Sequence, residues 1–217
     1  MTEPEPLRVN FDRQLKRVQR DVLRMGALVE NSCYLARQAM FERVLESAEL
    51  IRIQDREIDN LYKQIELDCV NLIALQSPVA QDLRMLSAMM QLVRDLERIG
   101  DYAKNLGDVA IRLFPYEDLP HLDQIRLMFD RCRAMLAMSL AALADLDAKS
   151  AQEMKIKDDA IDSDYDKLYT LLTQKTEVQG VIEPIVLLVL AIRHLERMAD
   201  HATNIGKRVS YIVTGNR

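Results

Sequence analysis

The stretch LERIGDYAKNLG, at residues 96–107, returns as LERMADHATNIG at residues 195–206. Seven of the twelve positions are identical, whereas the twelve residues before each copy share only one, Arg94 and Arg193. Both stretches lie within a helical spacing of apolar side chains. The sequence therefore predicts two equivalent helices that have the same polar residues in register, in halves that otherwise differ.

A second matching pair supports a duplication. The segments DREIDNLY, at residues 55–62, and DDAIDSDY, at residues 158–165, share the pattern D-x-x-I-D-x-x-Y. Their offset is 103 residues, against 99 for the first pair, so the first half is longer between its second and third helices, where a hairpin connection tolerates extra residues. A period of about a hundred residues indicates a duplicated domain and not a short solenoid repeat.

Apolar spacing and turn residues divide the chain into six long helices. The expected helices cover about residues 7–45, 47–76, 78–114, 122–146, 150–180 and 182–211. Ser47, Ser77 and the box S-A-Q-E that begins at Ser150 are the expected N-caps. Short connections favour antiparallel neighbours. We therefore predict an all-α protein of two tandem, similar three-helix bundles, at residues 7–114 and 120–214, joined by PYEDLPHLD at residues 115–123.

Composition excludes several classes of protein. The chain has 217 residues, a net charge of −5 and no long basic run, so nucleic acid is not an expected partner. We expect neither a signal peptide in MTEPEPLRVNF nor a membrane-spanning segment, and hence a cytoplasmic protein. Cys33, Cys69 and Cys132 are far apart and form no C-x-x-C motif, so we expect buried thiols in a reducing compartment.

The repeated stretches carry acids and amides four positions apart, which places them on one helix face. The candidate metal ligands are Glu97, Asp101 and Asn105 with Asp55 and Asp59 in the first half, and Glu196, Asp200 and Asn204 with Asp158 and Asp162 in the second. Carboxylate pairs on adjacent helices suit Mg²⁺, Ca²⁺ or Mn²⁺, and in part Fe or Zn²⁺. The apolar stripe of each helix points elsewhere, so we expect these acids to face away from the core of their own bundle.

A solvated face with local ion pairs is the simpler interpretation of each stretch. Arg98 and Arg197 can reach Asp101 and Asp200, and Arg94 and Arg193 can reach Glu97 and Glu196, all at i, i+3 and worth about 0.2–0.5 kcal/mol a pair. That interpretation does not explain why the same residues recur in register. A cation site does, with arginine nearby to orient the carboxylates.

The sequence also suggests roles for the histidines, glycines and tyrosines near the repeats. His201 follows Asp200 and could add a nitrogen ligand, and since its counterpart is Tyr102 the two sites would differ. Gly100 and Gly107 would allow a ligand or another backbone to approach, more easily at Gly100 than at its counterpart Ala199. We expect His121 and His194 at the surface, and Tyr62 and Tyr165 as packing residues with hydrogen-bonded hydroxyls.

Motifs of common catalytic sites are absent from the sequence. It contains no GxxxxGK[ST], GxGxxG or HExxH, and no Glu is followed by His three positions later as in di-iron bundle enzymes. No serine or cysteine has an obvious His and Asp arrangement, although a scattered triad would leave no local pattern.

These residues resemble the PhoU family. Two copies of E-R-x-x-D-x-A-x-N-x-G match its ExxxD signature at Glu97–Asp101 and Glu196–Asp200, and SPVAQDLRML (77–86) and NIGKRVSYIVTG (204–215) are similar to its flanking segments. The similarity covers nearly the whole chain after the first several residues. It implies two three-helix bundles, with a divalent or trivalent metal (Fe, Zn, Mn, Mg or Ca) at the ExxxD faces.

The resemblance also implies a function without catalysis. It points to a negative regulator of phosphate uptake and phosphate-starvation signalling. The partners it implies are the ATPase subunit of the phosphate ABC transporter and a phosphate-sensing histidine kinase. With it we expect a homodimer that meets the membrane only through those partners. A metal-dependent helical-bundle enzyme (hydrolase or oxidase), a metal-binding protein unrelated to phosphate and a purely structural bundle are the alternatives.

Overall fold

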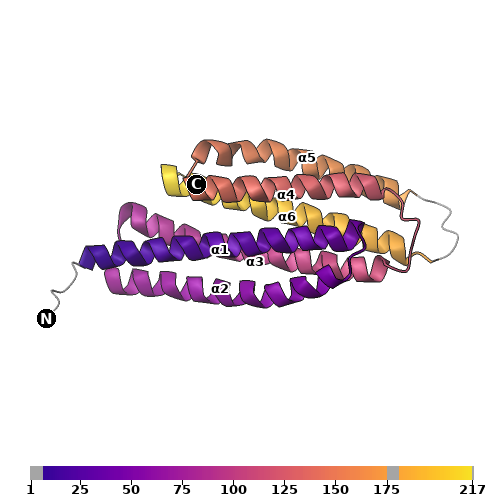
Figure 1. Ribbon diagram of the computed structural model, residues 1–217. Helices are drawn as coiled ribbons and strands as arrows, with labels where there is room; N and C mark the ends of the chain where they lie inside the picture. Colours follow the sequence, from indigo (N-terminus) through magenta and orange to yellow (C-terminus); the bar gives the residue numbers. More distant parts are fainter. Residues whose placement is uncertain (1–6, 175–180, 217) are drawn as a thin grey trace.

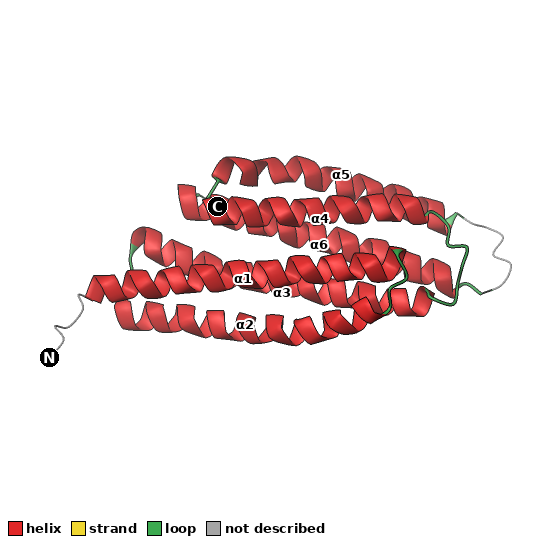
Figure 2. Ribbon diagram, in the orientation of Figure 1, coloured by secondary structure: helices red, strands yellow, loops and turns green. Residues whose placement is uncertain are grey.

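Six long helices build the protein in the computed structural model, which describes residues 7–174 and 181–216 (Figure 1). They are α1 (Leu7–Phe41), α2 (Glu46–Gln76), α3 (Ala80–Leu113), α4 (Leu122–Asp145), α5 (Ala148–Thr173) and α6 (Glu183–Thr214). The described ranges contain no strand, and their loops and turns lie at the two ends of the helices (Figure 2). The predicted all-α class is therefore confirmed.

The helices form two groups of three that lie side by side. Helices α1, α2 and α3 pack on one another, and α4, α5 and α6 form the second group (Figure 1). The groups meet where α3 packs along α6 and α1 packs against α4. Leu92, Leu96 and Ile99 on α3 are fully buried, as are Leu188, Ile192 and Leu195 on α6. The two repeated stretches thus lie on the helices that join the halves.

The first connection differs from the prediction. Helix α1 ends at Phe41 and not near residue 45, because Arg43 has a left-handed φ of 59°. Its guanidinium lies 4.5 Å from the centre of the Phe114 ring and donates to the Phe114 carbonyl, which ties this turn to the end of α3. Ser47 is not an N-cap: it lies inside α2, is buried, and donates its hydroxyl hydrogen bond to Gln38.

The predicted cap at Ser77 is also wrong. Ser77 ends α2 in a left-handed conformation (φ 45°) and donates its N–H to the carbonyl of Ile73. A residue before proline disfavours the right-handed helical region, and Pro78 follows Ser77 directly. Helix α3 begins only at Ala80, after an extended Val79.

The start of α5 uses a different residue from the predicted one. Asp147 is the N-cap, and its Oδ1 accepts hydrogen bonds from the N–H groups of Lys149 (2.9 Å) and Ser150 (3.2 Å). Ser150 lies within the first turn, and its hydroxyl donates to Asp147 Oδ2 at 2.6 Å. Helix α5 ends at Thr173, and the predicted end near Gly180 lies outside the described residues.

The extra residues of the first half lie in its helices and not in the connection. Helix α2 has 31 residues against 26 in α5, and α3 has 34 against 32 in α6, while the connection is shorter in the first half, at residues 77–79 against 174–182. The predicted insertion in that hairpin connection is therefore wrong. At the other end of the chain, α6 continues past residue 211 to Thr214 and ends at Gly215, whose φ of 77° stops the helix.

The two glycines of the first repeat serve helix packing. A Cβ on Gly107 would lie 3.2 Å from Ile51 Cδ1 and 3.6 Å from the Cα of Ala48, and one on Gly100 would lie 3.3 Å from Ile58 Cδ1. Both glycines therefore face α2, and the side chains that approach them belong to the core. The missing side chain of Gly100 allows α2 to pack closely, so the expected approach of a ligand at Gly100 is wrong.

Two further predictions concern thiols and membranes. Cys33, Cys69 and Cys132 are buried and free, as expected. Burial raises the pKa of the Cys33 and Cys69 thiols to about 12. Among the described helices, none combines the length and the apolar character needed to cross a bilayer.

Candidate functional site

The first acidic face lies between α2 and α3. Its members are Asp55, Asp59, Glu97, Asp101 and Asn105. Because α2 and α3 are packed neighbours, side chains four positions apart on each helix meet along one seam. Lys104 lies in this seam: its Nζ donates to Asp55 Oδ2 at 2.6 Å and to Asp101 Oδ1 at 2.9 Å. An ammonium group therefore joins the carboxylates of the two helices.

Glu97 shows how crowded the negative charges of this face are. Burial raises the pKa of its carboxyl group, and the charges of Asp101 and Asp59 raise it further. Arg98 opposes them from a distance, with its Nε 3.7 Å from Glu97 and its Nη1 4.0 Å from Asp101. The structure thus brings together the four acids that the sequence assigned to this face.

The second acidic face lies between α5 and α6. Its members are Asp158, Asp162, Glu196, Asp200 and Asn204. Burial raises the pKa of Asp162, and the charges of Asp158 and Asp200 add to the effect. Burial also raises the pKa of Glu196, followed by the charge of Asp200. These acids, too, lie close enough to act on one another.

Two carboxylate oxygens of the second acidic face lack partners. Asp158 Oδ1 and Glu196 Oε2 are buried, and neither accepts a hydrogen bond from any described residue. Asp158 as a whole is 6% exposed, so the expectation that the acids face away from the core is wrong at this position, and the alternative of a solvated face fails there as well. Its other oxygen has Lys155 at 3.6 Å. A buried carboxylate oxygen without a donor is costly, and such oxygens are normally satisfied by a donor, a water or a cation.

Position 203 explains why the two faces differ. In the aligned repeats, Thr203 stands where the first half has Lys104. Thr203 is 3% exposed, and its hydroxyl oxygen lacks a hydrogen-bond partner within the described chain. Threonine carries no charge, so nothing at this position replaces the ammonium that lies between Asp55 and Asp101.

The two faces therefore suit a metal ion unequally. At the first face, Lys104 already occupies the place between the carboxylates, and its charge would repel a cation. At the second face, unpartnered carboxylate oxygens are the donors that hard cations prefer. As the side chains stand in the described residues, no three Asp, Glu, His or Cys groups are close enough to hold an ion.

The arginines and asparagines of the repeats have local partners. Arg193 contacts Glu196 at 2.9 Å and Arg197 contacts Asp200 at 3.5 Å, as the spacing predicts. Arg94 and Glu97 both lie in the described part of the chain, but the ion pair expected between them is not formed. Asn204 accepts from Lys207 at 3.5 Å, and Asn105 is half-buried.

Comparison with known proteins decides the family. The family model described as PhoU domain matches twice, at residues 22–110 and 125–209, which is most of the chain. A Synechocystis protein described as a phosphate-specific transport system accessory protein PhoU homolog is 54% identical over 212 residues, covering 98% of this chain and 95% of that protein. The chain belongs to the PhoU family.

Solved PhoU structures have the same arrangement of helices. The crystal structure of PhoU from Pseudomonas aeruginosa matches with a TM-score of 0.88 at 31% identity, over 95% of this chain and 100% of that one. The structure of the phosphate transport system regulatory protein PhoU from Streptococcus pneumoniae gives 0.88 at 32% identity, over 95% and 98%. The two bundles predicted from the repeat are thus a PhoU fold.

Two of the three histidines of this PhoU-family chain do not lie where the sequence placed them. His201 turns away from the second acidic face, and its Nδ1 lies 2.8 Å from Oδ1 of the buried Asp95 on α3. His194 is half-buried, not at the surface, and burial lowers its pKa. The Tyr102 ring packs against both, with centroids 5.6 Å and 5.9 Å away. These residues join the halves of the PhoU fold; His121, at the start of α4, is half-exposed.

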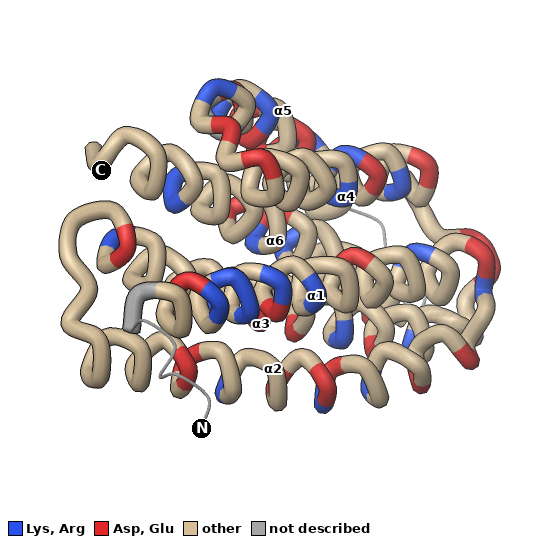
Figure 3. The backbone as a smooth tube through the Cα atoms, turned by 60° about the vertical axis from the view of Figure 1, so that its left-hand side comes forward, with Lys and Arg blue, Asp and Glu red and all other residues tan. Residues whose placement is uncertain are grey.

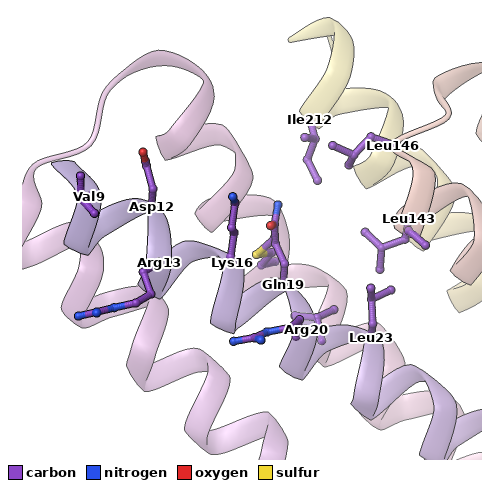
Figure 4. Close-up of a pocket in the computed structure, with 13 residues that line it drawn as sticks. Val9, Asp12, Arg13, Lys16, Gln19, Arg20, Leu23, Leu143, Leu146 and Ile212 are labelled. Atoms are coloured by element: carbon purple, nitrogen blue, oxygen red, sulfur yellow. The ribbon is translucent and has the colours of Figure 1, made fainter.

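Two grooves were not predicted from the sequence. One, of about 710 Å³, lies where α2 and α3 meet α6 and has four arginines in its wall: Arg94, Arg98, Arg197 and Arg208. The other, of about 810 Å³, lies between α1 and the ends of α4 and α6. There Lys16 and Arg20 lie on one side, and Leu143, Leu146 and Ile212 lie on the other (Figure 4). Both grooves need the two PhoU repeats side by side, which no local pattern reveals.

Proposed function

We propose that the chain is a non-enzymatic, cytoplasmic regulator of phosphate uptake that negatively regulates phosphate-starvation signalling. Its partners would be the ATPase subunit of the phosphate ABC transporter and the phosphate-sensing histidine kinase. Relatives named as accessory or regulatory proteins of phosphate transport support this role. The chain would act as an adaptor, because its described surface is built from long rigid helices whose charged residues are interspersed (Figure 3).

We further propose that the second acidic face holds one metal ion in the functional protein. The supporting observation is the pair of buried, unpartnered oxygens on Asp158 and Glu196. Asp162 and Asp200 would supply further oxygen donors. A bound cation would offset the negative charge of this face and so allow a partner to dock there. The first acidic face has its own cation in Lys104 and would remain without metal.

Metal analysis of matched variants tests this assignment. Glu196→Gln/Asp200→Asn and Glu97→Gln/Asp101→Asn remove the same charge from equivalent positions while keeping size and polarity. After chelator treatment and reloading with Mn²⁺, Zn²⁺ or Fe, elemental analysis should find about one ion per wild-type chain. The second-half variant should lose that ion, and the first-half variant should keep it. Equal loss in both variants, or no ion in the wild type, would contradict the proposal.

Binding to isolated partners tests the adaptor role. Titrations of metal-loaded protein with the ATPase subunit and with the kinase domain should give saturable binding. Charge steering makes such association sensitive to salt, since screening acts over about 10 Å at about 0.1 M. Glu97→Gln/Glu196→Gln should weaken both the binding and its salt dependence. If neither changes, the acidic faces are not the docking surface, and if neither partner binds the wild type, the adaptor role is wrong.

A further inference from the structure

The groove between α2, α3 and α6, here called the arginine groove, has more arginines in its wall than the groove at α1. It has a volume of about 710 Å³, and its polar wall includes the four guanidinium groups of Arg94, Arg98, Arg197 and Arg208. Such a volume falls in the range of small-molecule sites, roughly 300–1,000 Å³. The chain as a whole has a net charge of −5, so this concentration of positive charge runs against its overall balance.

The acids of the groove do not neutralise these arginines. Only Glu66 and Asp95 line it, and Asp95 is buried and engaged by His201 at 2.8 Å. Glu66 lies beside Tyr62 and is one of the charges that raise the pKa of its hydroxyl. The lining of the groove therefore has four guanidinium groups against two carboxylates, one of which faces a histidine, and Arg197 has a further partner in Asp200 at 3.5 Å.

The guanidinium groups themselves have capacity for a ligand. Within the described residues, neither Arg94 nor Arg208 has a carboxylate within 4.0 Å, and the buried Arg208 Nε has no hydrogen-bond acceptor. Arg98 is held only by contacts of 3.7 Å and 4.0 Å to Glu97 and Asp101. Arg84, Arg126 and Arg133, outside the groove, also have a buried Nε without an acceptor in the described chain, so what distinguishes the groove is that guanidinium groups with free donors gather at one cavity.

The repeated motif places one arginine on each side of the groove. Arg98 and Arg197 occupy the same position of the two copies, and both line the groove because α3 and α6 pack along one another. A residue retained for an ion pair in its own bundle would not need to meet its duplicate. Here the two meet at one cavity, which exists only when the halves are docked.

We propose that the arginine groove binds a small molecule that carries a phosphate group. Planar guanidinium groups donate paired hydrogen bonds that match phosphate oxygens, and several of them together favour a multiply charged oxyanion over a single carboxylate. Tyr62 and Tyr102 line the same groove and offer aromatic surface to the remainder of an organic phosphate. Inorganic phosphate and a nucleotide share this recognition chemistry.

Calorimetric titration of the full chain, stripped of metal and dialysed, tests the inference. The probes are ATP and inorganic phosphate, with sodium chloride as a control for ionic strength. Removing metal matters because phosphate held by an ion on an acidic face would otherwise imitate groove binding. We expect saturable binding of at least one phosphate probe at millimolar concentration or below, tighter for ATP if the tyrosines contribute.

Matched arginine variants locate the site. Arg94→Gln/Arg208→Gln should weaken binding by at least about tenfold, since each lost charged hydrogen bond is worth that much. Arg17→Gln/Arg24→Gln removes the same charge from arginines that pair with Asp68 and Glu57 outside the groove, and should bind like the wild type. Because Arg208 is partly buried, Arg94→Gln alone is measured as well, with helicity checked by circular dichroism.

The outcomes separate this inference from the proposed metal site. Asp158→Asn/Asp162→Asn, which removes metal-site acids that form no ion pair with a groove arginine among the described residues, should leave phosphate binding in place. No binding of ATP or phosphate to the stripped wild type would overturn the proposal, and so would equal loss in the two arginine pairs. A preference of ATP over phosphate identifies an organic ligand, while equal affinities identify the inorganic ion.

Discussion

One aligned position sets the balance of charge in each acidic face. At position 104 the lysine Nζ lies 2.6 Å and 2.9 Å from two carboxylates on different helices. At the equivalent position 203 a buried threonine leaves its hydroxyl unpartnered, and two carboxylate oxygens of the second acidic face, on Asp158 and Glu196, also lack partners. The duplicated motif is therefore the same in its acids but different in what neutralises them.

Replacing Lys104 with methionine should make the stability of the protein depend on metal. The variant keeps the apolar stem but leaves Asp55 and Asp101 facing each other without an ammonium. Because a hydrogen bond to a charged group is worth about 1.5–3 kcal/mol and the Lys104 side chain is 30% exposed, we expect a loss near the lower end. Thermal unfolding should show this loss of stability in the presence of a chelator. Adding Mn²⁺ or Ca²⁺ should restore the unfolding temperature.

The matching change in metal content gives that experiment its control. Lys104→Met should bind about one ion more per chain than the wild type, whereas Lys63→Met, on the exposed side of α2, should alter neither property. An unfolding temperature that metal does not raise in Lys104→Met would show that the lysine is not taking the place of a cation.

The buried thiols should make the fold sensitive to alkali. Burial raises the pKa of Cys33 from 9.0 to about 12, so between those values the unfolded chain has lost a proton that the folded chain keeps. Stability should therefore be unaffected by this thiol below pH 9 and fall above it, by up to about 1.4 kcal/mol per pH unit. Urea midpoints across this range should fall less steeply in Cys33→Ala.

Lysine and tyrosine side chains also lose protons in alkali, so a second measurement is needed that reports on the thiols alone. In the folded protein at mildly alkaline pH, Cys33 and Cys69 should react slowly with iodoacetamide, because the thiolate is the reactive form and neither is exposed. Unfolding in urea should make them react quickly. Rapid alkylation of the folded chain would show that these helices open more readily than their packing indicates.

Local spacing predicted the ligand candidates but not their partners. The i, i+4 rule placed Glu97 with Asp101 correctly, because both lie on one helix. The partner of His201 lies on another helix in the other half, so its distance from Asp95 depends on how α3 and α6 are docked. The same holds for Lys104, whose bond to Asp55 depends on the register of α2 against α3.

At the scale of the helices, the sequence located the bodies of the elements and misplaced several ends. Periodicity over thirty or so residues is a strong signal, because each added turn repeats it. A cap is a single residue, and Asp147 and Ser150 are both residue types that cap helices. The backbone conformation distinguishes them, because Asp147 is extended and lies directly before the first helical residue. Its carboxylate accepts hydrogen bonds from two N–H groups and from the Ser150 hydroxyl.

Helix α2 packs closely enough on α3 that one added side chain should separate them. Gly107→Val would place a β-carbon 3.2 Å from Ile51 Cδ1 and 3.6 Å from the Ala48 backbone, which has little freedom to move. We expect a loss of about 1–3 kcal/mol in the free energy of unfolding, as overpacked cores show. Urea unfolding followed by circular dichroism measures it.

Gly100→Ala is the companion variant. Its nearest neighbour is the flexible end of Ile58, at 3.3 Å, and the second half already has alanine at the same position, Ala199. A gain of up to about 1 kcal/mol in helix propensity should offset the tighter contact. If Gly107→Val proves as stable as Gly100→Ala, the close packing of α2 on α3 is not maintained in solution.

At the scale of the whole molecule, the two halves share one interior. Fully buried side chains of α3 and α6 lie along the line where the halves join, and Arg37 on α1 adds a 2.7 Å ion pair to Asp130 on α4. We expect a single unfolding transition, with far-ultraviolet and tyrosine near-ultraviolet circular dichroism coinciding. Two separate transitions would show that each half folds without the other.

The repeat predicted two similar bundles but not how they would sit together. Each third helix is apolar over more than the stripe that its own bundle needs, as the run of residues 185–192 shows, yet a surplus of apolar residues does not name its partner. The arginine groove follows from that docking, since it draws on α2, α3 and α6. No window of the sequence contains more than part of it.

The order in which the helices are synthesised leaves an apolar side of α3 uncovered while the chain is still growing. Helix α3 is complete at Leu113, but α6, which covers its second apolar side, begins only at Glu183. Since α6 is complete only at Thr214, a chain growing at about 5–20 residues per second would expose that side for roughly 5–20 s. The nascent first half should therefore be a client of the chaperones that bind emerging hydrophobic segments, and a chain interrupted before α6 should be recognised by proteases as incomplete.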